Sequence, residues 1–210
     1  MTTVIGLDLS LTSTGIATLT YDPTNGDHTV ELQAITSAPA PKPRDAKGKL
    51  EPQTLGDREA RLTRLRQAIV GACRGADLVC VEGPSFGSNN SGTWDRGGLW
   101  WLVVTGLARL EVPHADVPPA TVKKFACDNG TAAKVAVAAG ITRMWPDQHP
   151  HGDDQFDALA LASIALVLSV PRVTADTVGM PFRVLERHRQ AIAKVVLPES
   201  PRRTQLERNL

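Results

Sequence analysis

The order of apolar and polar segments predicts an α/β domain on a mixed five-stranded sheet, with three antiparallel strands, then two parallel strands, and helices on both faces. Three apolar runs near the N-terminus are separated only by polar turns, which is typical of an antiparallel meander. Apolar runs then alternate with segments of helical periodicity, a pattern that gives parallel strands joined by helices. At 210 residues, the chain is long enough for one such domain and an appendage.

The individual elements follow from apolar runs and from the residues that interrupt them. The expected strands span residues 4–9, 15–20, 28–35, 78–82 and 112–117. The expected helices span residues 57–74, 96–109, 118–127, 131–144 and 154–170. In this order the first strand lies centrally with the fourth parallel beside it, so their carboxyl ends meet at one edge. Ligands bind at this edge in related sheets.

Two segments differ in composition from the rest of the predicted domain, which spans residues 1–170. Residues 37–56 hold four prolines and little apolar content, which predicts a loop or an insertion. Residues 171–210 carry a net charge of +4, whereas the first 170 residues carry −3. This stretch is expected to be a basic tail, partly helical or disordered, that either contacts a polyanion or is simply solvated.

The N-terminal sequence and the cysteines indicate in which cellular compartment the protein is expected. The sequence has no run of eighteen apolar residues and no basic N-terminal region with a cleavage site. Cys73, Cys80 and Cys127 are odd in number, far apart and without zinc-site spacing. We therefore expect a protein of the reducing cytoplasm, with the three cysteines as small buried apolar residues.

Four acidic residues occupy places where a chain normally avoids charge. Asp8 interrupts one apolar run, Glu82 ends another, and Asp154 and Asp157 open the most apolar helix. A carboxylate beside a buried strand is costly unless it is paired or bound to metal. Carboxylates without cysteine partners favour Mg²⁺ or Mn²⁺, and two such ions can clamp a phosphodiester. The sequence thus predicts one site for two hard divalent cations.

Spacing alone leaves the register of the last two acids open. Asp154 and Asp157 are three residues apart and share a helix face, but Asp153 lies four before Asp157. One member of the Asp153–Asp154 pair is expected to cap the helix, because aspartate is favoured at that position.

Four sequence motifs follow one another along the chain: GLDLSLTSTGIA, VCVEGPSF, PPATVKKFACDNGTAAKVAV and DDQFDALALA. Together they resemble the motifs of RuvC-type Holliday-junction resolvases, a family of the RNase H-like superfamily, over residues 1–170. The resemblance implies an endonuclease that cuts branched DNA with Mg²⁺ or Mn²⁺ and works as a homodimer, in a bacterial or phage context. It maps the family's four acids onto Asp8, Glu82, Asp154 and Asp157, which leaves Asp153 for the helix cap.

The resemblance also implies roles for residues outside the acids. Lys123 and Lys134 match lysines of the family that lie near the scissile phosphate, and Lys124 adjoins them as a further DNA-binding candidate. Phe86 matches an aromatic residue that can stack at opened base pairs. The chain departs from the family in its first motif, where Leu9-Ser10 replaces a Pro-Gly turn. Residues 37–56 and 171–210 are also additions to the family pattern. The sequence therefore fits a phage-type relative that cuts a wider range of branched DNA equally well.

Other interpretations remain open at this level. An RNase H acting on hybrids, a branched-DNA binder without catalysis, and an actin-like or sugar-kinase-like ATPase share parts of the pattern. Trp94, Trp100 and Trp101 flank the helix at 96–109, where core packing is the first expectation and a dimer interface the second. His149 and His151 are expected to be solvated loop residues rather than metal ligands.

Overall fold

The structure is a computed structural model that describes residues 1–39, 42, 44–49, 51–84, 92–170 and 179–198. The strands are β1 (Thr2–Asp8), β2 (Ser13–Tyr21), β3 (His28–Thr36), β4 (Leu78–Glu82) and β5 (His114–Val117). The helices are α1 (Leu55–Ala72), α2 (Thr93–Arg109), α3 (Pro119–Cys127), α4 (Lys134–Met144), α5 (Asp153–Ser169) and α7 (Glu186–Ile192). None of the helices in the described ranges is long and apolar enough to cross a membrane.

The five strands form one sheet in the order β3-β2-β1-β4-β5. β1 pairs antiparallel with β2 and parallel with β4, and β5 pairs parallel with β4. The predicted mixed sheet, with the first strand at its centre and the fourth beside it, is therefore confirmed. The carboxyl ends of β1, β4 and β5 lie at one edge.

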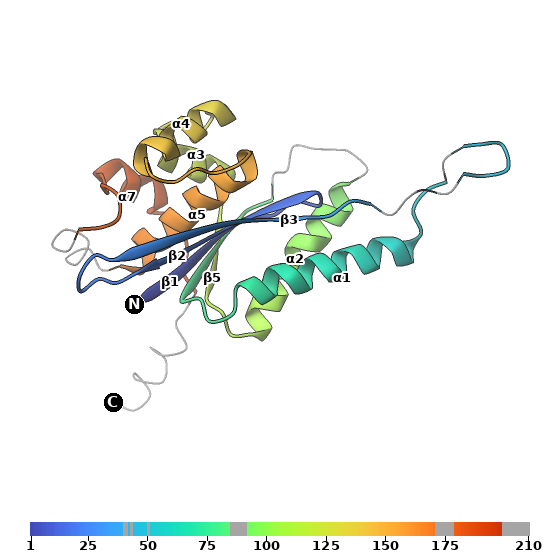
Figure 1. The fold of residues 1–210 in the computed structure, drawn as a ribbon, viewed down its shortest axis with the longest axis horizontal. Helices are drawn as coiled ribbons and strands as arrows, with labels where there is room; N and C mark the ends of the chain where they lie inside the picture. Colours follow the sequence, from blue (N-terminus) through green and yellow to red (C-terminus); the bar gives the residue numbers. More distant parts are fainter. Residues whose placement is uncertain (40–41, 43, 50, 85–91, 171–178, 199–210) are drawn as a thin grey trace.

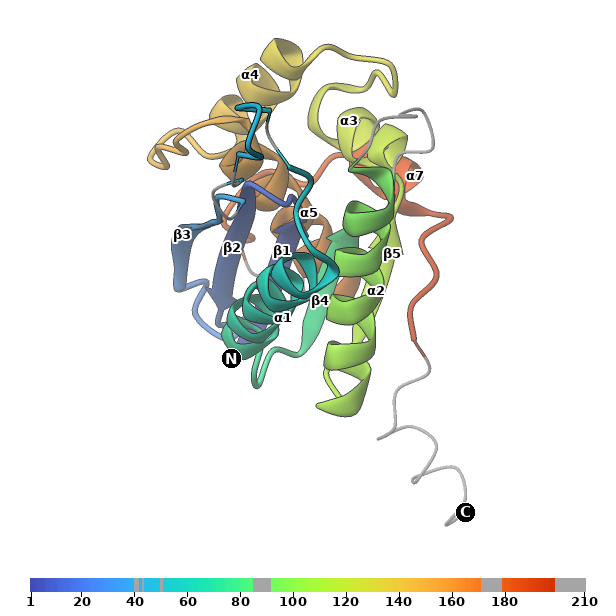
Figure 2. The same ribbon diagram turned by 90° about the vertical axis from the view of Figure 1, so that its right-hand side faces the viewer.

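Helices cover both faces of the sheet and separate two hydrophobic cores (Figures 1 and 2). Along β1, Val4 points into the core shared with α5, whereas Ile5 and Leu7 point into the core shared with α1 and α2. This alternation is the period of two expected for a central strand. α5 contacts β1, β2 and β4 and is buried along nearly its whole length, which explains its lack of an amphipathic pattern.

The C-terminal segment adds a further layer on the α5 side. α7 packs against α3, and the ring of His188 lies 4.8 Å from that of Phe125, centroid to centroid. Phe182, just before α7, packs on Trp145 with a centroid distance of 5.1 Å. Residues 182–192 of the expected basic tail thus contribute to the hydrophobic core.

Two expectations about side-chain environment are partly wrong. Trp94 and Trp101 are 87% and 63% exposed, so core packing does not hold for them, although Trp100 is half-buried. Cys73 and Cys80 are buried as expected, but Cys127 is partly exposed because it lies at the end of α3.

Candidate active site

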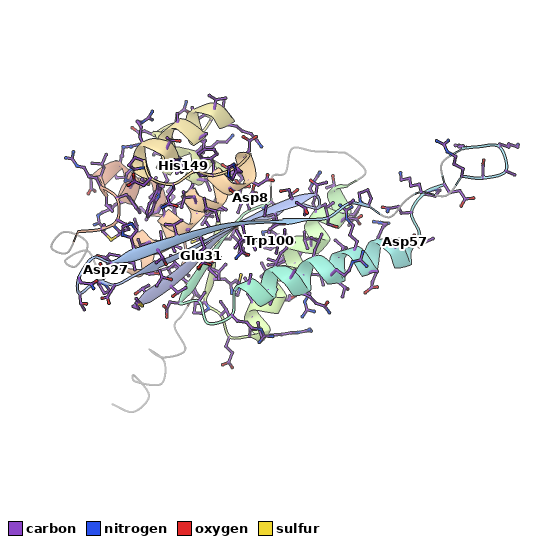
Figure 3. All side chains as sticks on the ribbon, in the orientation of Figure 1. Asp8, Asp27, Glu31, Asp57, Trp100 and His149 are labelled. Atoms are coloured by element: carbon purple, nitrogen blue, oxygen red, sulfur yellow. The ribbon has the colours of Figure 1, made fainter. Side chains whose placement is uncertain are left out.

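Asp8 and Glu82 meet at the carboxyl edge of the sheet. Each is the last residue of its strand, and the parallel register places Leu7 beside Val81, so the next residues are neighbours. Their carboxyl groups share a hydrogen bond. Figure 3 shows Asp8 at this end of the sheet, near the start of α5.

Two glycines allow α5 to approach this edge closely. Gly15 is the register partner of Asp8 on β2, and a Cβ atom there would overlap the backbone carbonyl of Asp154. A Cβ atom at Gly6 would overlap the backbone of α5 at Ala158 and Ala162. The absence of side chains at these positions therefore sets the place of Asp154 beside Asp8. No local pattern in the sequence marks these glycines as determinants of the site.

The charges of the acids act on one another. Burial, followed by the charges of Glu82, Asp157 and Asp154, raises the pKa of Asp8 to about 8. Burial and Asp157 raise the pKa of Glu82 to about 7. Burial also raises the pKa of Asp157 above its usual range. Carboxylates from β1, β4 and α5 thus repel one another in a poorly solvated place, which is a common property of functional sites.

The donor set suits a hard divalent cation. All four side chains are carboxylates, and a bound cation would relieve both their repulsion and their desolvation. Within the described ranges, no three acidic, histidine or cysteine side chains already form a metal-ligand cluster. Asp8 and Glu82 are instead turned toward each other in their hydrogen bond.

Two of the three predicted lysines lie near the acids. The charges of Lys123 and Lys134 both act to lower the pKa values of Glu82 and Asp157. Lys124 is exposed on α3 and does not enter the described pKa shifts of these acids. Phe86 lies outside the described residues.

The predicted helix cap is wrong. α5 begins at Asp153, its N-cap is Gly152 at φ +76°, and no side chain caps it. Asp153 instead pairs with Lys134, with 3.1 Å between the carboxylate oxygen and Nζ. The backbone of Asp154 lies against Gly15, and the charge of Asp154 acts on Asp8.

The turn after Asp8 is held by side chains that spacing did not reveal. The buried hydroxyl of Thr14 donates to the Ser10 carbonyl at 2.9 Å and accepts from the Ser10 N–H at 3.1 Å. Arg61 of α1 donates to the carbonyl groups of Leu11 and Ser37. These bonds close the turn in which Leu9-Ser10 replaces Pro-Gly.

Other contacts fix the surroundings of the edge. The indole Nε1 of Trp100 donates to the backbone carbonyl of Glu82 at 2.9 Å and so ties α2 to the end of β4. The buried side chain of Gln155 accepts from the N–H of His151 at 2.7 Å and holds the loop before α5. His149 and His151 are exposed, as expected.

Comparison with known proteins identifies the family of this fold. No known protein-family profile matches the chain. The chain is 30% identical over 148 residues to the crossover junction endodeoxyribonuclease RuvC of Sorangium cellulosum (strain So ce56), covering 70% of this chain and 83% of that protein. This protein belongs to the RuvC family.

Solved structures agree on the fold. Thermus thermophilus RuvC superposes with a TM-score of 0.57 at 22% identity, covering 76% of this chain and 90% of that one. The structure of T. thermophilus RuvC in complex with a Holliday junction substrate superposes with a TM-score of 0.56 at 19% identity. The match covers 77% of this chain and 90% of that one. These structures confirm the predicted fold class, and the Sorangium relative confirms the predicted family.

Proposed function

We propose that this protein is a metal-dependent endonuclease that cuts Holliday junctions, and other branched DNA, inside the bacterial cytoplasm. The observation that carries the proposal is the convergence of acids from β1, β4 and the start of α5 at one sheet edge. Membership of the RuvC family supplies the reaction, and the Holliday junction bound to the Thermus relative supplies the substrate class.

Asp8, Glu82, Asp154 and Asp157 are the proposed ligands of two Mg²⁺ or Mn²⁺ ions. When bound, such ions lower the pKa of water and stabilise the leaving oxygen of a phosphodiester. Asp8 occupies the central place, because its carboxyl group feels all three other acids. The Thr14 and Arg61 hydrogen bonds hold the turn that follows Asp8 and thereby orient this ligand.

Lys123 and Lys134 are proposed to hold the phosphate backbone beside the acids. A lysine supplies a compact positive charge that can pair with a phosphate oxygen without fixed geometry. Lys134 is paired with Asp153 only at the surface, with both side chains more than half exposed. Such an exposed pair is weak and exchanges readily for a phosphate. Lys124 is proposed as a more distant backbone contact.

Replacing Lys134 with methionine is expected to lower the rate of cleavage at saturating DNA by roughly a hundredfold, because a charge facing the reacting phosphate is lost. Lys134→Arg should recover part of that rate. Lys124→Met, an equal loss of charge on α3, should have a much smaller effect. Single-turnover cleavage of a labelled four-way junction measures all three variants. An equal effect of the two methionine variants would contradict the proposed role of Lys134.

A homodimer is proposed through the exposed face of α2, where Trp94 and Trp101 lie. Large exposed aromatic side chains are unusual on a monomer and frequent at the centres of interfaces. Cutting two strands of a junction symmetrically also requires two active sites.

The double variant Trp94→Ser, Trp101→Ser is expected to be monomeric, because the proposed apolar contact is removed. The unchanged protein should have twice the chain mass of 22.5 kDa in sedimentation or light scattering at micromolar concentration. Val135→Ser is the matched control, since Val135 is 81% exposed but lies on α4. A monomeric unchanged protein would refute this interface.

The substrate panel tests the main proposal against its alternatives. A labelled four-way junction, a flap, a splayed duplex and an RNA–DNA hybrid are incubated with the protein, with and without Mg²⁺. Preferred, Mg²⁺-dependent cutting of the junction is expected. Preferred cutting of the hybrid would identify an RNase H, and binding of the junction without a product would identify a branched-DNA binder. In a separate assay with ATP, ATP turnover by a protein that does not cut DNA would favour the ATPase.

A further inference from the structure

The described residues between β3 and α1 project from the body at the end of the sheet that carries Asp8 (Figures 1 and 3). The base of this segment is fixed to the turn that follows Asp8. The N–H of Ser37 donates to the carbonyl of Thr12 at 2.9 Å, and Arg61 bonds both Leu11 and Ser37. The projecting segment thus has a defined starting point next to the proposed active site.

The far end of this segment is a compact turn built around Asp45. The Asp45 carboxylate accepts from the N–H groups of Lys47 and Lys49, each at 2.9 Å. The N–H of Asp45 donates to the carbonyl of Lys49, and Arg44 donates to the carbonyl of Gly48 at 2.6 Å. Gly48 has φ +75°, which glycine adopts without strain. The single acid is therefore turned inward by its hydrogen bonds.

We call Lys42 and residues 44–49 the basic turn. Lys42, Arg44, Lys47 and Lys49 are all exposed, and Asp45 is the only acid among these residues, so the basic turn carries +3. The first 170 residues as a whole carry −3. The basic turn is thus a positive projection on an otherwise acidic body.

We propose that the basic turn binds the phosphate backbone of a duplex arm next to the cleavage point. This inference rests on the proposed function, and it assigns a second DNA contact away from the acids. The four acids repel phosphate and oppose the attraction of Lys123 and Lys134 beside them, so a further positive surface strengthens the binding of DNA. A chain of about ten residues reaches at most on the order of 30 Å, comparable to one turn of duplex DNA. The basic turn therefore gives affinity and orientation without reading sequence.

The test is the triple variant Lys42→Gln, Lys47→Gln, Lys49→Gln, which keeps Arg44, Asp45 and the backbone bonds of the turn. Binding to a four-way junction is measured in EDTA over a range of salt concentrations. Each phosphate contact contributes about 0.9 to the slope of log affinity against log salt, so the slope should fall by about 2 to 3. Affinity near physiological salt should fall roughly tenfold to a hundredfold.

Two controls separate the proposal from general charge and folding effects. Arg64→Gln, Arg74→Gln, Arg109→Gln removes the same charge from exposed positions in the α1–α2 layer and should change the slope much less. The triple lysine-to-arginine variant of the basic turn should bind as the unchanged protein does. An unaltered slope in the glutamine variant, or an equal loss in the control triple, would overturn this inference alone. An unchanged protein that neither binds nor cuts branched DNA would overturn the proposed function as well.

Discussion

Replacing Asp8 with asparagine is expected to reduce Mg²⁺-dependent cleavage of a four-way junction by roughly a thousandfold or more, because the central proposed ligand loses its charge. Junction binding should persist, since the lysines and the basic turn are intact. Cleavage by the purified variant and gel-shift binding at the same protein concentrations measure the two effects. Full cleavage would refute the assignment of the site.

The same variant should be more stable than the unchanged protein in EDTA at pH 8 to 9. Folding raises the pKa of Asp8 to about 8, so the folded state holds its proton more tightly than the unfolded state does. The contribution of the Asp8 carboxyl group to the free energy of unfolding is therefore fully present below about pH 4 and is lost as the pH rises through about 8. Asparagine removes the ionisation and can still donate to Glu82, so the free energy of unfolding should rise by about 2 kcal/mol. Urea unfolding measures this, and a clear loss of stability would contradict the described carboxyl pair.

Replacing Gly15 with alanine is expected to lower the free energy of unfolding by about 3 kcal/mol and cleavage by roughly a hundredfold. A Cβ atom there would overlap the backbone of Asp154, so α5 must shift away from β2. That shift carries Asp154 and Asp157 away from Asp8 and Glu82. Urea unfolding and single-turnover cleavage measure the two effects.

Gly71→Ala is the matched control. Gly71 lies in α1 and a Cβ atom there would meet nothing within 4 Å. Alanine at an unhindered helical position should stabilise the protein by about 0.5 to 1 kcal/mol and leave cleavage intact. If Gly15→Ala behaved like Gly71→Ala, the close approach of α5 would not determine the site.

The sequence was sufficient to predict the sheet order and the acidic edge because their signals are local. A carboxylate at the end of a buried apolar run marks Asp8 and Glu82 without knowledge of any partner. The order of strands and helices then limits which strand ends can meet. The choice of Asp154 over Asp153 as the partner of Asp157 needed the family resemblance, because the spacing along the helix fitted both residues equally.

The remaining features depend on contacts between distant segments. The importance of Gly15 follows only from the place where α5 packs, and the role of Arg61 follows from its contact with a turn fifty residues earlier. Asp153 does not cap its helix because Gly152 takes that place and Lys134, from another helix, provides a partner. An apolar side chain such as Trp94 gives no local sign of whether it meets the core or a second molecule.

In the proposed dimer, the hydrogen bond from Trp100 to the carbonyl of Glu82 would connect the active site to the interface. Trp100 also touches the exposed Trp101 edge-on, with ring centroids 4.9 Å apart. In the proposed dimer, burying Trp101 against a second copy would fix the ring beneath it and, through that ring, the end of β4. Each active site would then sense whether its partner is present. If the protein cuts two strands in concert as a dimer, the end of β4 would be less ordered in the monomer than in the dimer.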